Sequence, residues 1–317
     1  MKNLLLIGSG QLGSRYIQGV IRNTVNYNIT VVDSSKLSLN KAKKIWAESG
    51  GDKSFHKIFW NQTLPRDIKK YDLAIIATSS KNRAALIDYI CSEVNVSYWV
   101  LEKVLAQSNK ELKMIEAATS HAKNVYVNTP RRLMKWHQKI KSKFSEKPLL
   151  VKKTGKLWGL ACNAIHFIDL VAWWTGQSLL SVDTKKLHKK WFESKREGYY
   201  EVTGELSAKF SGGTELVLQS LYDAKEEVLM VEFNNKDSCV IYENKGTTLF
   251  SNGDILNGSL ELQSEMTGPL IDKILTKGTC ELPTLKESLK QHKVFLEAML
   301  EHWNRSNNCN DKLVPIT

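Results

Sequence analysis

Two short stretches carry the side chains best suited to moving a proton. Glu102 and Lys103 follow the apolar run YWVL, which predicts a buried strand, so both stand at a strand end. A lysine at such an edge can hold a substrate oxygen and give or take its proton. Spacing alone leaves equally open a solvated lysine that is paired with a carboxylate.

The second stretch, GLACNAIHFIDLVAWWTG, predicts a helix over residues 159–176. His166 and Asp169 lie three residues apart and share a face, where an aspartate can fix the imidazole tautomer. A histidine in so apolar a run is nevertheless more often a hydrogen-bonded core residue. Cys162 could join the two as a metal ligand, but the helix offers no fourth ligand, so we expect no metal.

The elements that must position these side chains begin with a glycine-rich turn near the start of the chain. The apolar run LLLI stops at G-x-G-x-x-G, and an amphipathic segment follows. The first glycine permits the turn, the second lets the backbone approach a pyrophosphate, and the third lets helix and strand pack closely. The helix then begins beneath the phosphates. The turn residues expected at this site are Gly8, Gly10, Gln11, Leu12 and Gly13.

A second apolar run ends in Asp33, 20 residues beyond Gly13, where a dinucleotide-binding unit places an acid for a ribose hydroxyl. A carboxylate accepts hydrogen bonds from a 2′-OH and repels a 2′-phosphate, so the sequence favours NAD over NADP. Residues 34–36, Ser-Ser-Lys, suit a phosphate and keep NADP open. The alternative is a glycine turn with an incidental strand-end aspartate.

Strands and helices alternate as far as Asn128, which predicts a doubly wound parallel sheet with ligands outside the carboxyl ends of its strands. Later, period-two alternation broken by Gly-Gly, Asn-Asn and Lys-Gly turns predicts an antiparallel sheet, and residues 282–303 predict a closing amphipathic helix. The predicted fold is an α/β Rossmann domain, residues 1–127, followed by an α+β domain, residues 128–317, with an open, mostly antiparallel sheet.

The segment 131–156 holds ten Lys or Arg residues and one acid, Glu146. Its aromatic residues raise the possibility of nucleic-acid binding. Trp136, Ile140 and Phe144, however, are spaced i, i+4, i+8, as in one buried helical stripe with the lysines in solvent. A solvated basic face is the better interpretation, and we expect no specific nucleic-acid partner.

Composition fits a protein with two cores. The chain has 317 residues, 42% of them hydrophobic, and a net charge of +12, which concentrates anions such as nucleotides and acidic sugars. Its five cysteines are scattered without C-x-x-C spacing, so neither a disulfide framework nor a zinc site is expected. No apolar run reaches a membrane span and no signal peptide is evident, so we expect a cytoplasmic protein.

Over most of its length the chain resembles the Gfo/Idh/MocA family, the glucose-fructose oxidoreductase and inositol dehydrogenase group. The resemblance lies in the order and separation of five motifs: GSGQLGSRY, ATSSKNR, LEK, VNTPRR and IHFIDLVAWWTG. The resemblance implies NAD- or NADP-dependent oxidation or reduction of sugars and cyclitols. It also implies that Lys103 is the catalytic lysine, His166 the catalytic or substrate-holding histidine and Asp169 its companion. Further expected contacts are Thr78, Ser79 and Glu102 for the cofactor, and Arg131, Arg132 and Asn163 for the substrate.

Two positions depart from the family pattern. Val104 stands where a proline commonly follows E-K, and Cys162 stands where an aspartate commonly lies four residues before the histidine. Asn163 or water then takes over the polar contact, or the chemistry differs, or activity is weak.

The leading hypothesis is an oxidoreductase acting on a sugar or sugar derivative, with an acidic or nucleotide-linked sugar of surface-polysaccharide biosynthesis as the candidate substrate. The alternative is a catalytically impaired dinucleotide-binding sensor or partner protein. Homo-oligomerisation through the C-terminal sheet is expected, because the alternation predicts an exposed apolar sheet face unless the last helix covers it. The residues assigned to that face are Val217, Leu229, Val231 and Phe233.

Overall fold

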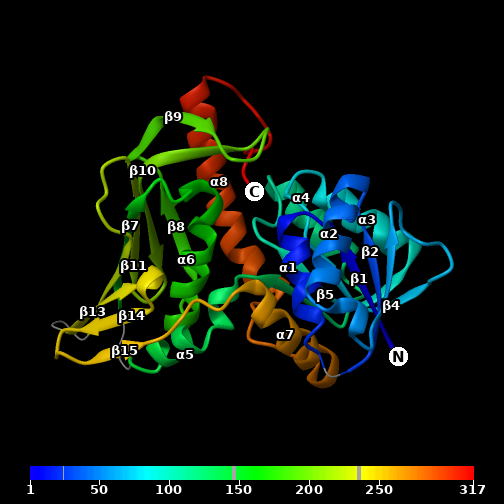
Figure 1. The fold of residues 1–317 in the computed structure, drawn as a ribbon. Helices are drawn as coiled ribbons and strands as arrows, with labels where there is room; N and C mark the ends of the chain where they lie inside the picture. Colours follow the sequence, from blue (N-terminus) through cyan, green and yellow to red (C-terminus); the bar gives the residue numbers. More distant parts are fainter. Residues whose placement is uncertain (24, 145–147, 234–236) are drawn as a thin grey trace. The chain divides into compact units, whose positions relative to one another are not determined.

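The computed structural model describes the whole chain except residues 24, 145–147 and 234–236 (Figure 1). The chain divides into two compact units. The first comprises Met1–Leu105, Glu111–Asn128 and Glu261–Leu285, and the second comprises Ala106–Lys110, Thr129–Leu260 and Lys286–Thr317. Among the residues described, no helix is long and apolar enough to cross a membrane.

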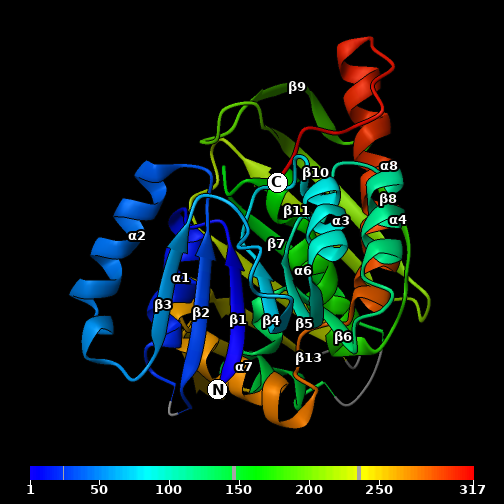
Figure 2. The same ribbon diagram turned by 90° about the vertical axis from the view of Figure 1, so that its right-hand side faces the viewer.

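Six parallel strands form the sheet of the first unit, in the order β3-β2-β1-β4-β5-β6 (Figure 2). The side chains of β1, β2 and β4 are buried in continuous runs, as expected for a sheet covered on both faces, whereas the edge strand β3 is partly exposed. The strands are β1 Lys2–Ile7, β2 Tyr27–Val32, β3 Lys57–Asn61, β4 Lys70–Ile76, β5 Asn95–Glu102 and β6 Asn124–Asn128. The connecting helices are α1 Gln11–Val20, α2 Lys36–Glu48, α3 Arg83–Glu93 and α4 Asn109–Ala118. This strand order confirms the predicted Rossmann fold.

A helix from late in the chain completes the first unit. α7, Gln263–Lys277, packs against α1, although the sequence assigned everything after residue 127 to one continuous second domain. Gly19 permits the close approach, because a Cβ there would lie 2.5 Å from Cβ of Thr267. Asp272 accepts hydrogen bonds from Asn23 Nδ2 at 2.7 Å and Tyr27 Oη at 2.6 Å.

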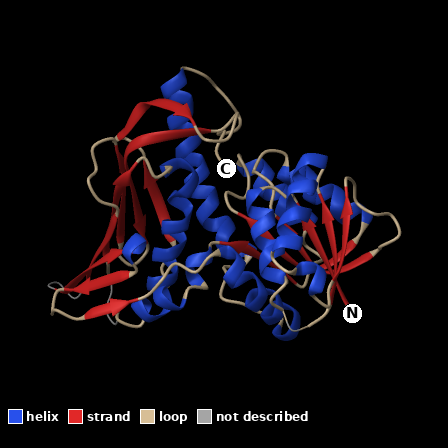
Figure 3. Cartoon of the chain, in the orientation of Figure 1, coloured by secondary structure: helices blue, strands red, loops and turns tan. Residues whose placement is uncertain are grey.

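The second unit contains a nine-stranded sheet in the order β15-β14-β13-β12-β7-β11-β10-β8, with β9 pairing β10 (Figure 3). Of its strand pairs, only β7 and β11 run parallel within the part of the chain described. The strands are β7 Leu150–Lys156, β8 Leu179–Asp183, β9 Leu187–Glu193, β10 Tyr200–Phe210, β11 Glu215–Leu221, β12 Val228–Phe233, β13 Asp237–Tyr242, β14 Thr247–Phe250 and β15 Ile255–Asn257. The mostly antiparallel sheet and its Gly-Gly and Lys-Gly turns were predicted correctly; the Asn-Asn turn and Glu146 lie outside the described residues.

The apolar residues assigned to the exposed sheet face lie mainly on the other face. Leu229 and Val231 are fully buried and Phe233 is 8% exposed, so that part of the prediction is wrong. The opposite face carries Met230, which is 41% exposed, because side chains alternate along a strand. Period-two spacing identifies the two faces but does not reveal which one the helices cover.

Three helices accompany this sheet: α5 Lys135–Lys141, α6 Leu160–Thr175 and α8 Leu285–Asn307. The predicted stripe of the basic segment is buried, with Trp136 and Ile140 on α5 and Phe144 just beyond it, while Lys135 and Lys139 are exposed. The solvated basic face is thereby confirmed for α5, which is shorter than the stripe implied, but not for the whole segment, because Arg132 and Lys153 are buried.

Candidate cofactor and active site

The turn between β1 and α1 has the shape that its glycines predict. Gly8 adopts φ +91°, in the region that favours glycine. A Cβ on Gly13 would lie 1.9 Å from the Gly8 carbonyl oxygen, so only glycine fits there. A Cβ on Gly10 would meet no described atom within 4 Å, which leaves open space above the backbone. Gln11 and Leu12 begin α1, where backbone N–H groups lack carbonyl partners within the helix.

The Asp33 carboxylate lies beside this turn. Its Oδ2 accepts hydrogen bonds from the Ser9 backbone N–H at 2.7 Å and the Ser9 hydroxyl at 3.0 Å, and its Oδ1 accepts one from the Ser35 backbone N–H at 2.8 Å. A carboxylate has about four acceptor sites, so it retains capacity for a ribose hydroxyl. Ser9, which the sequence did not single out, holds the acid at the turn.

Two buried polar atoms at the carboxyl edge of the parallel sheet support the fit to a dinucleotide. Thr78 Oγ1 and Asn61 Nδ2 find no hydrogen-bond partner among the described residues. Thr78 also approaches the glycine turn, since its Cγ2 would lie 3.2 Å from a Cβ on Gly8. Ser79 follows it in the same loop and is half-buried. Unmet hydrogen-bonding capacity at this edge suits a polar ligand.

Glu102 lies in a buried network at the end of β5. Tyr16 Oη donates to its Oε1 at 2.5 Å, and Asn128 Nδ2 donates to the same oxygen at 2.7 Å. Asn128 Nδ2 also contacts Gln263 Oε1 at 2.9 Å, which links α7 to this network. Burial raises the pKa of Glu102, against the opposing effect of the Tyr16 and Asn128 hydrogen bonds. The predicted contact of Glu102 with a cofactor stays a prediction.

Lys103 is half-buried in the first unit and follows β5 directly, at the carboxyl edge. Its peptide bond to Val104 is cis. His166 and Asp169 belong to the second unit, on α6. The pairing of Lys103 with His166 at one reaction centre therefore stays a prediction.

Asp169 holds two donors that the sequence did not assign to it. Arg132 binds it through Nε at 2.8 Å and Nη2 at 2.6 Å, and the Thr129 hydroxyl donates to it at 2.7 Å. The side chains of Arg132 and Asp169 are 7% and 1% exposed. The pair anchors α6 to the segment that enters the second unit, and its predicted roles toward substrate stay predictions.

Arg131, the other predicted substrate ligand, forms a bidentate ion pair with Glu243 at 2.7 and 2.8 Å. His137 Nε2 lies 3.0 Å from the same carboxylate. Burial favours the neutral acid, but Arg131 and His137 hold the pKa of Glu243 well below its usual range. Sequence spacing missed this cluster because Glu243 lies more than 100 residues from both partners.

Lys153 on β7 is 1% exposed and binds Glu227 at 2.7 Å. Burial lowers the pKa of Lys153, although Glu227 opposes the shift. Its Nζ lies 5.4 Å from the ring centre of Phe167, next to His166, and Arg131 lies 4.4 Å from that ring. No pattern in the sequence predicts this buried cation.

The start of α6 is capped by Glu201, whose carboxylate accepts the backbone N–H groups of Ala161 at 2.8 Å and Cys162 at 3.2 Å. Asn163 Nδ2 donates to the Trp158 carbonyl at 3.0 Å. The amide predicted to replace the missing aspartate thus also fixes the turn before the helix.

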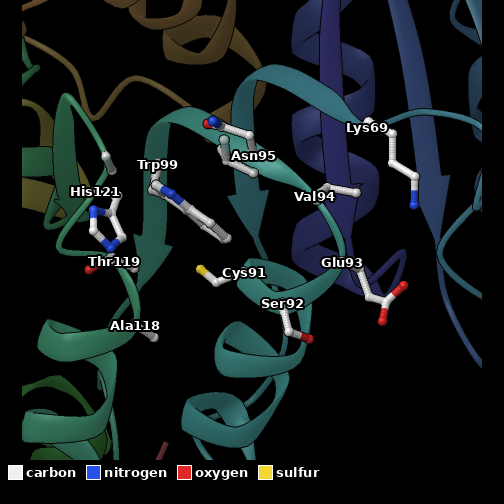
Figure 4. A pocket seen from close by; sticks show the side chains of 12 residues that line it. Lys69, Cys91, Ser92, Glu93, Val94, Asn95, Trp99, Ala118, Thr119 and His121 are labelled. Atoms are coloured by element: carbon white, nitrogen blue, oxygen red, sulfur yellow. The ribbon is translucent and has the colours of Figure 1, made fainter.

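A separate pocket of about 320 Å³ lies at the amino end of β5 (Figure 4). Trp99, Cys91 and His121 are among its lining residues. Burial raises the pKa of Cys91 to about 11, so its thiol is neutral at pH 7. The predicted site, in contrast, occupies the carboxyl ends of the strands. Among the described residues, no three His, Cys, Asp or Glu side chains gather closely enough to hold a metal ion.

Comparisons with known proteins identify the fold. By sequence, no family model and no curated protein matches the chain. An Agrobacterium radiobacter oxidoreductase, solved with NAD⁺, L-tartaric acid and magnesium, superposes with a TM-score of 0.71 at 16% identity, covering 95% of this chain and 96% of that one.

Two named dehydrogenases superpose over a similar extent. For scyllo-inositol dehydrogenase from Lactobacillus casei the TM-score is 0.67 at 16% identity, with 96% of each chain covered. For UDP-N-acetylglucosamine 3-dehydrogenase from Acidithiobacillus ferrooxidans it is 0.65 at 12% identity, with 94% of this chain and 95% of that one covered. The chain has the fold of these oxidoreductases, which confirms the fold expected from the Gfo/Idh/MocA resemblance.

Proposed function

We propose that this protein is an NAD-dependent oxidoreductase that transfers hydride between the nicotinamide and a secondary alcohol or keto carbon of a sugar or sugar derivative. The observation that carries the proposal is the glycine turn. Open space lies over Gly10, and beside the turn the Asp33 carboxylate is held by hydrogen bonds from Ser9. An open backbone beside an acid suits the pyrophosphate and ribose of NAD.

Equilibrium binding of NADH and NADPH, followed by fluorescence, tests this proposal. We expect NADH to bind more tightly than NADPH, and Asp33→Ala to weaken NADH binding at least about tenfold and abolish the preference, because one charge-assisted hydrogen bond contributes about 1.5–3 kcal/mol. Asp52→Ala, an exposed acid of the same unit, is the matched control and should bind like the parent. Absence of binding by either nucleotide would overturn the proposal.

Each residue of the proposed site has a separate role around a bound cofactor. The N–H groups at the start of α1 hold the phosphates, Asp33 holds the ribose, and Thr78 Oγ1 and Ser79 complete the edge of the site. The nicotinamide supplies the acceptor or donor of hydride. Lys103 holds the substrate oxygen and takes its proton during oxidation or returns it during reduction. The role proposed for His166 is to hold a hydroxyl of the substrate.

The net charge of +12 supports an acidic or nucleotide-linked sugar as substrate, because a positive field raises the local concentration of anions. Arg131 forms an ion pair with Glu243, and Arg132 forms one with Asp169. Because both charges are already neutralised, we assign the two arginines to holding the segments around α6 in place and not to neutralising the substrate. Asn163 remains a candidate for a direct substrate contact.

A second candidate function follows from Cys162, which stands where the family commonly has an aspartate. A protein that has lost this carboxylate could bind dinucleotide as a sensor or partner protein without turnover. It would bind NADH as above, yet show no substrate-dependent NADH formation across sugar acids, cyclitols and nucleotide sugars. Turnover of any of these substrates would exclude this reading.

We also propose that the uncovered face of the nine-stranded sheet joins copies of this chain. The pairing register aligns one row of residues across that face. The row is Val217, Lys152, Met230, Val240, Leu249 and Ile255. Met230, Leu249 and Ile255 are 41%, 40% and 63% exposed, and exposed apolar side chains in one row favour association.

A further inference from the structure

A buried guanidinium lies under the loop that carries Lys103. Arg83 is the first residue of α3, and only 1% of it is exposed. Arginine is almost never fully buried unless its charge is paired or hydrogen-bonded, because losing its hydration is costly. Its partners therefore explain why the chain keeps a cation at this position.

Four backbone carbonyl oxygens surround this guanidinium. Nη1 lies 2.6 Å from the oxygen of Glu102, 2.5 Å from that of Val104 and 3.2 Å from that of Leu105. Nη2 donates to the carbonyl oxygen of Thr78. One side chain thus holds the backbone on both sides of Lys103 and also the loop after β4.

Both loops belong to the proposed cofactor edge. Thr78 lies against Gly8 of the glycine turn and has the buried, unpartnered Oγ1 described above. Lys103 lies between two of the carbonyls that Arg83 binds. Arg83 therefore connects the loop beside the cofactor turn to the loop that carries the proposed proton-transfer residue.

Arg83 restrains the backbone at Val104, where no proline ring does so. The ring of a proline at this position would fix its φ, whereas a valine leaves this dihedral free to vary. Val104 and Leu105 are both fully buried, so their backbone has one defined course. A planar fork with five N–H donors can bind carbonyls in several directions, which the ammonium of a lysine cannot reproduce.

We propose that Arg83 is a positioning residue that sets the place of Lys103 relative to the cofactor edge by binding the carbonyls of residues 78, 102, 104 and 105. This inference rests on the proposed function for the role of Lys103, but the hold on the loop can be measured without it. Arg83 itself touches neither substrate nor cofactor in this proposal.

Arg83→Lys tests the inference, with Arg66→Lys, an exposed arginine of the same unit, as the matched control. We expect amide hydrogen exchange in residues 101–106 to quicken at least tenfold in Arg83→Lys and to stay unchanged in Arg66→Lys. NADH affinity should stay within about threefold of the parent. With a substrate found by screening, kcat should fall at least tenfold while KM changes little, because Lys103 is displaced and not removed.

The double variant Arg83→Lys/Val104→Pro supplies the rescue. Proline supplies a φ restriction but not the lost hydrogen bonds, so the rescue is partial: exchange in residues 101–106 and kcat should both lie between the values of Arg83→Lys and those of Val104→Pro alone. If Arg83→Lys does not fold, the same comparison is made between these two proline variants, and slower turnover with faster loop exchange in the double variant then supports the inference.

Exchange in residues 101–106 that matches the parent would overturn the inference, as would a rise in KM with kcat unchanged. Failure of the proposed function looks different, since the parent would then bind no NADH while loop exchange still responded to Arg83→Lys.

Discussion

The carboxylate of Asp169 is the main partner of a cation with almost no solvent around it. Asp169→Asn leaves Arg132 buried beside a neutral amide, and breaking a buried ion pair in this way costs about 3–5 kcal/mol. We expect a loss near 3 kcal/mol, since Glu287 also lies 3.6 Å from Arg132. Urea unfolding measures the loss, and Asp223→Asn, an exposed acid, should change the free energy of unfolding by less than about 0.5 kcal/mol.

Lys103 is the residue on which turnover should depend. Lys103→Ala removes the proposed proton-transfer group, which typically contributes about 10²–10⁴-fold, without touching the glycine turn. Turnover should fall by that range while NADH affinity changes less than about twofold. Lys81→Ala changes an exposed lysine of a neighbouring loop and should leave both quantities unchanged. Near-parental turnover in Lys103→Ala would defeat the assignment.

Glu243 should make stability depend on pH in a defined direction. Its pKa in the folded protein lies well below 4.5, its usual value, owing to Arg131 and His137 in spite of burial. The unfolded chain therefore binds the proton first, so the stabilisation is complete above about pH 4.5 and is lost as pH falls toward the folded value.

Urea unfolding between about pH 6 and pH 3 checks this expectation. Glu243→Gln should be less stable than the parent at pH 6, and its stability should fall less steeply below pH 4.5. Glu232→Gln, on an exposed position of β12, should follow the slope of the parent. Identical slopes for Glu243→Gln and the parent would contradict the assigned pKa direction.

At the scale of elements, two glycines, Gly10 just before α1 and Gly19 in its last turn, should behave in opposite ways. Gly19→Leu drives a side chain into Thr267 and the Ser264 carbonyl of α7, and such overpacking costs about 1–3 kcal/mol. Gly10→Ala meets no described atom and should leave stability within about 0.5 kcal/mol. NADH binding should show the reverse order, with Gly10→Ala weakened and Gly19→Leu near the parent. Equal effects of both variants on stability would argue against the packing of α7 on α1.

These elements also show what local sequence can encode. The spans of α3 and α6 follow from apolar spacing and end signals, and the structure places α3 at residues 83–93 and α6 at residues 160–175. α7 escaped prediction because Gly268-Pro269 is typical of a turn. The glycine is explained by its close approach to the Gly19 carbonyl oxygen, where a Cβ would lie 3.1 Å away. A contact between residues so distant in sequence leaves no periodic signal.

Among the site residues too, those in local motifs could be predicted from the sequence and those that depend on distant contacts could not. Asp33 was found because the turn and the acid have a fixed spacing in one local unit. The partners of Asp169 and Glu243 were not found, since ion pairs across 37 to 112 residues depend on the completed fold. Arg83 was overlooked because its partners are backbone carbonyls, which every residue has.

For the whole molecule, the uncovered sheet face predicts association. Met230→Lys combined with Leu249→Lys adds two charges to the apolar row and should convert an oligomer to monomers, because unpaired charges at an interface core are costly. Light scattering after size-exclusion chromatography measures the mass. Leu37→Lys, a 65% exposed residue of α2, should leave the mass unchanged. A monomeric parent, or an oligomer that survives both substitutions, would exclude this interface.

The return of α7 to the first unit also governs how the chain is made. The ribosome delivers β1 to β6 early, but the helix that covers α1 emerges only after residues 129–260, which hold all nine strands of the other sheet. Domains usually fold in order of synthesis. Here the apolar face of α1 stays uncovered until residue 277 leaves the exit tunnel. A chain halted after Asn128 should therefore be bound by chaperones and cut by proteases, unlike a finished domain.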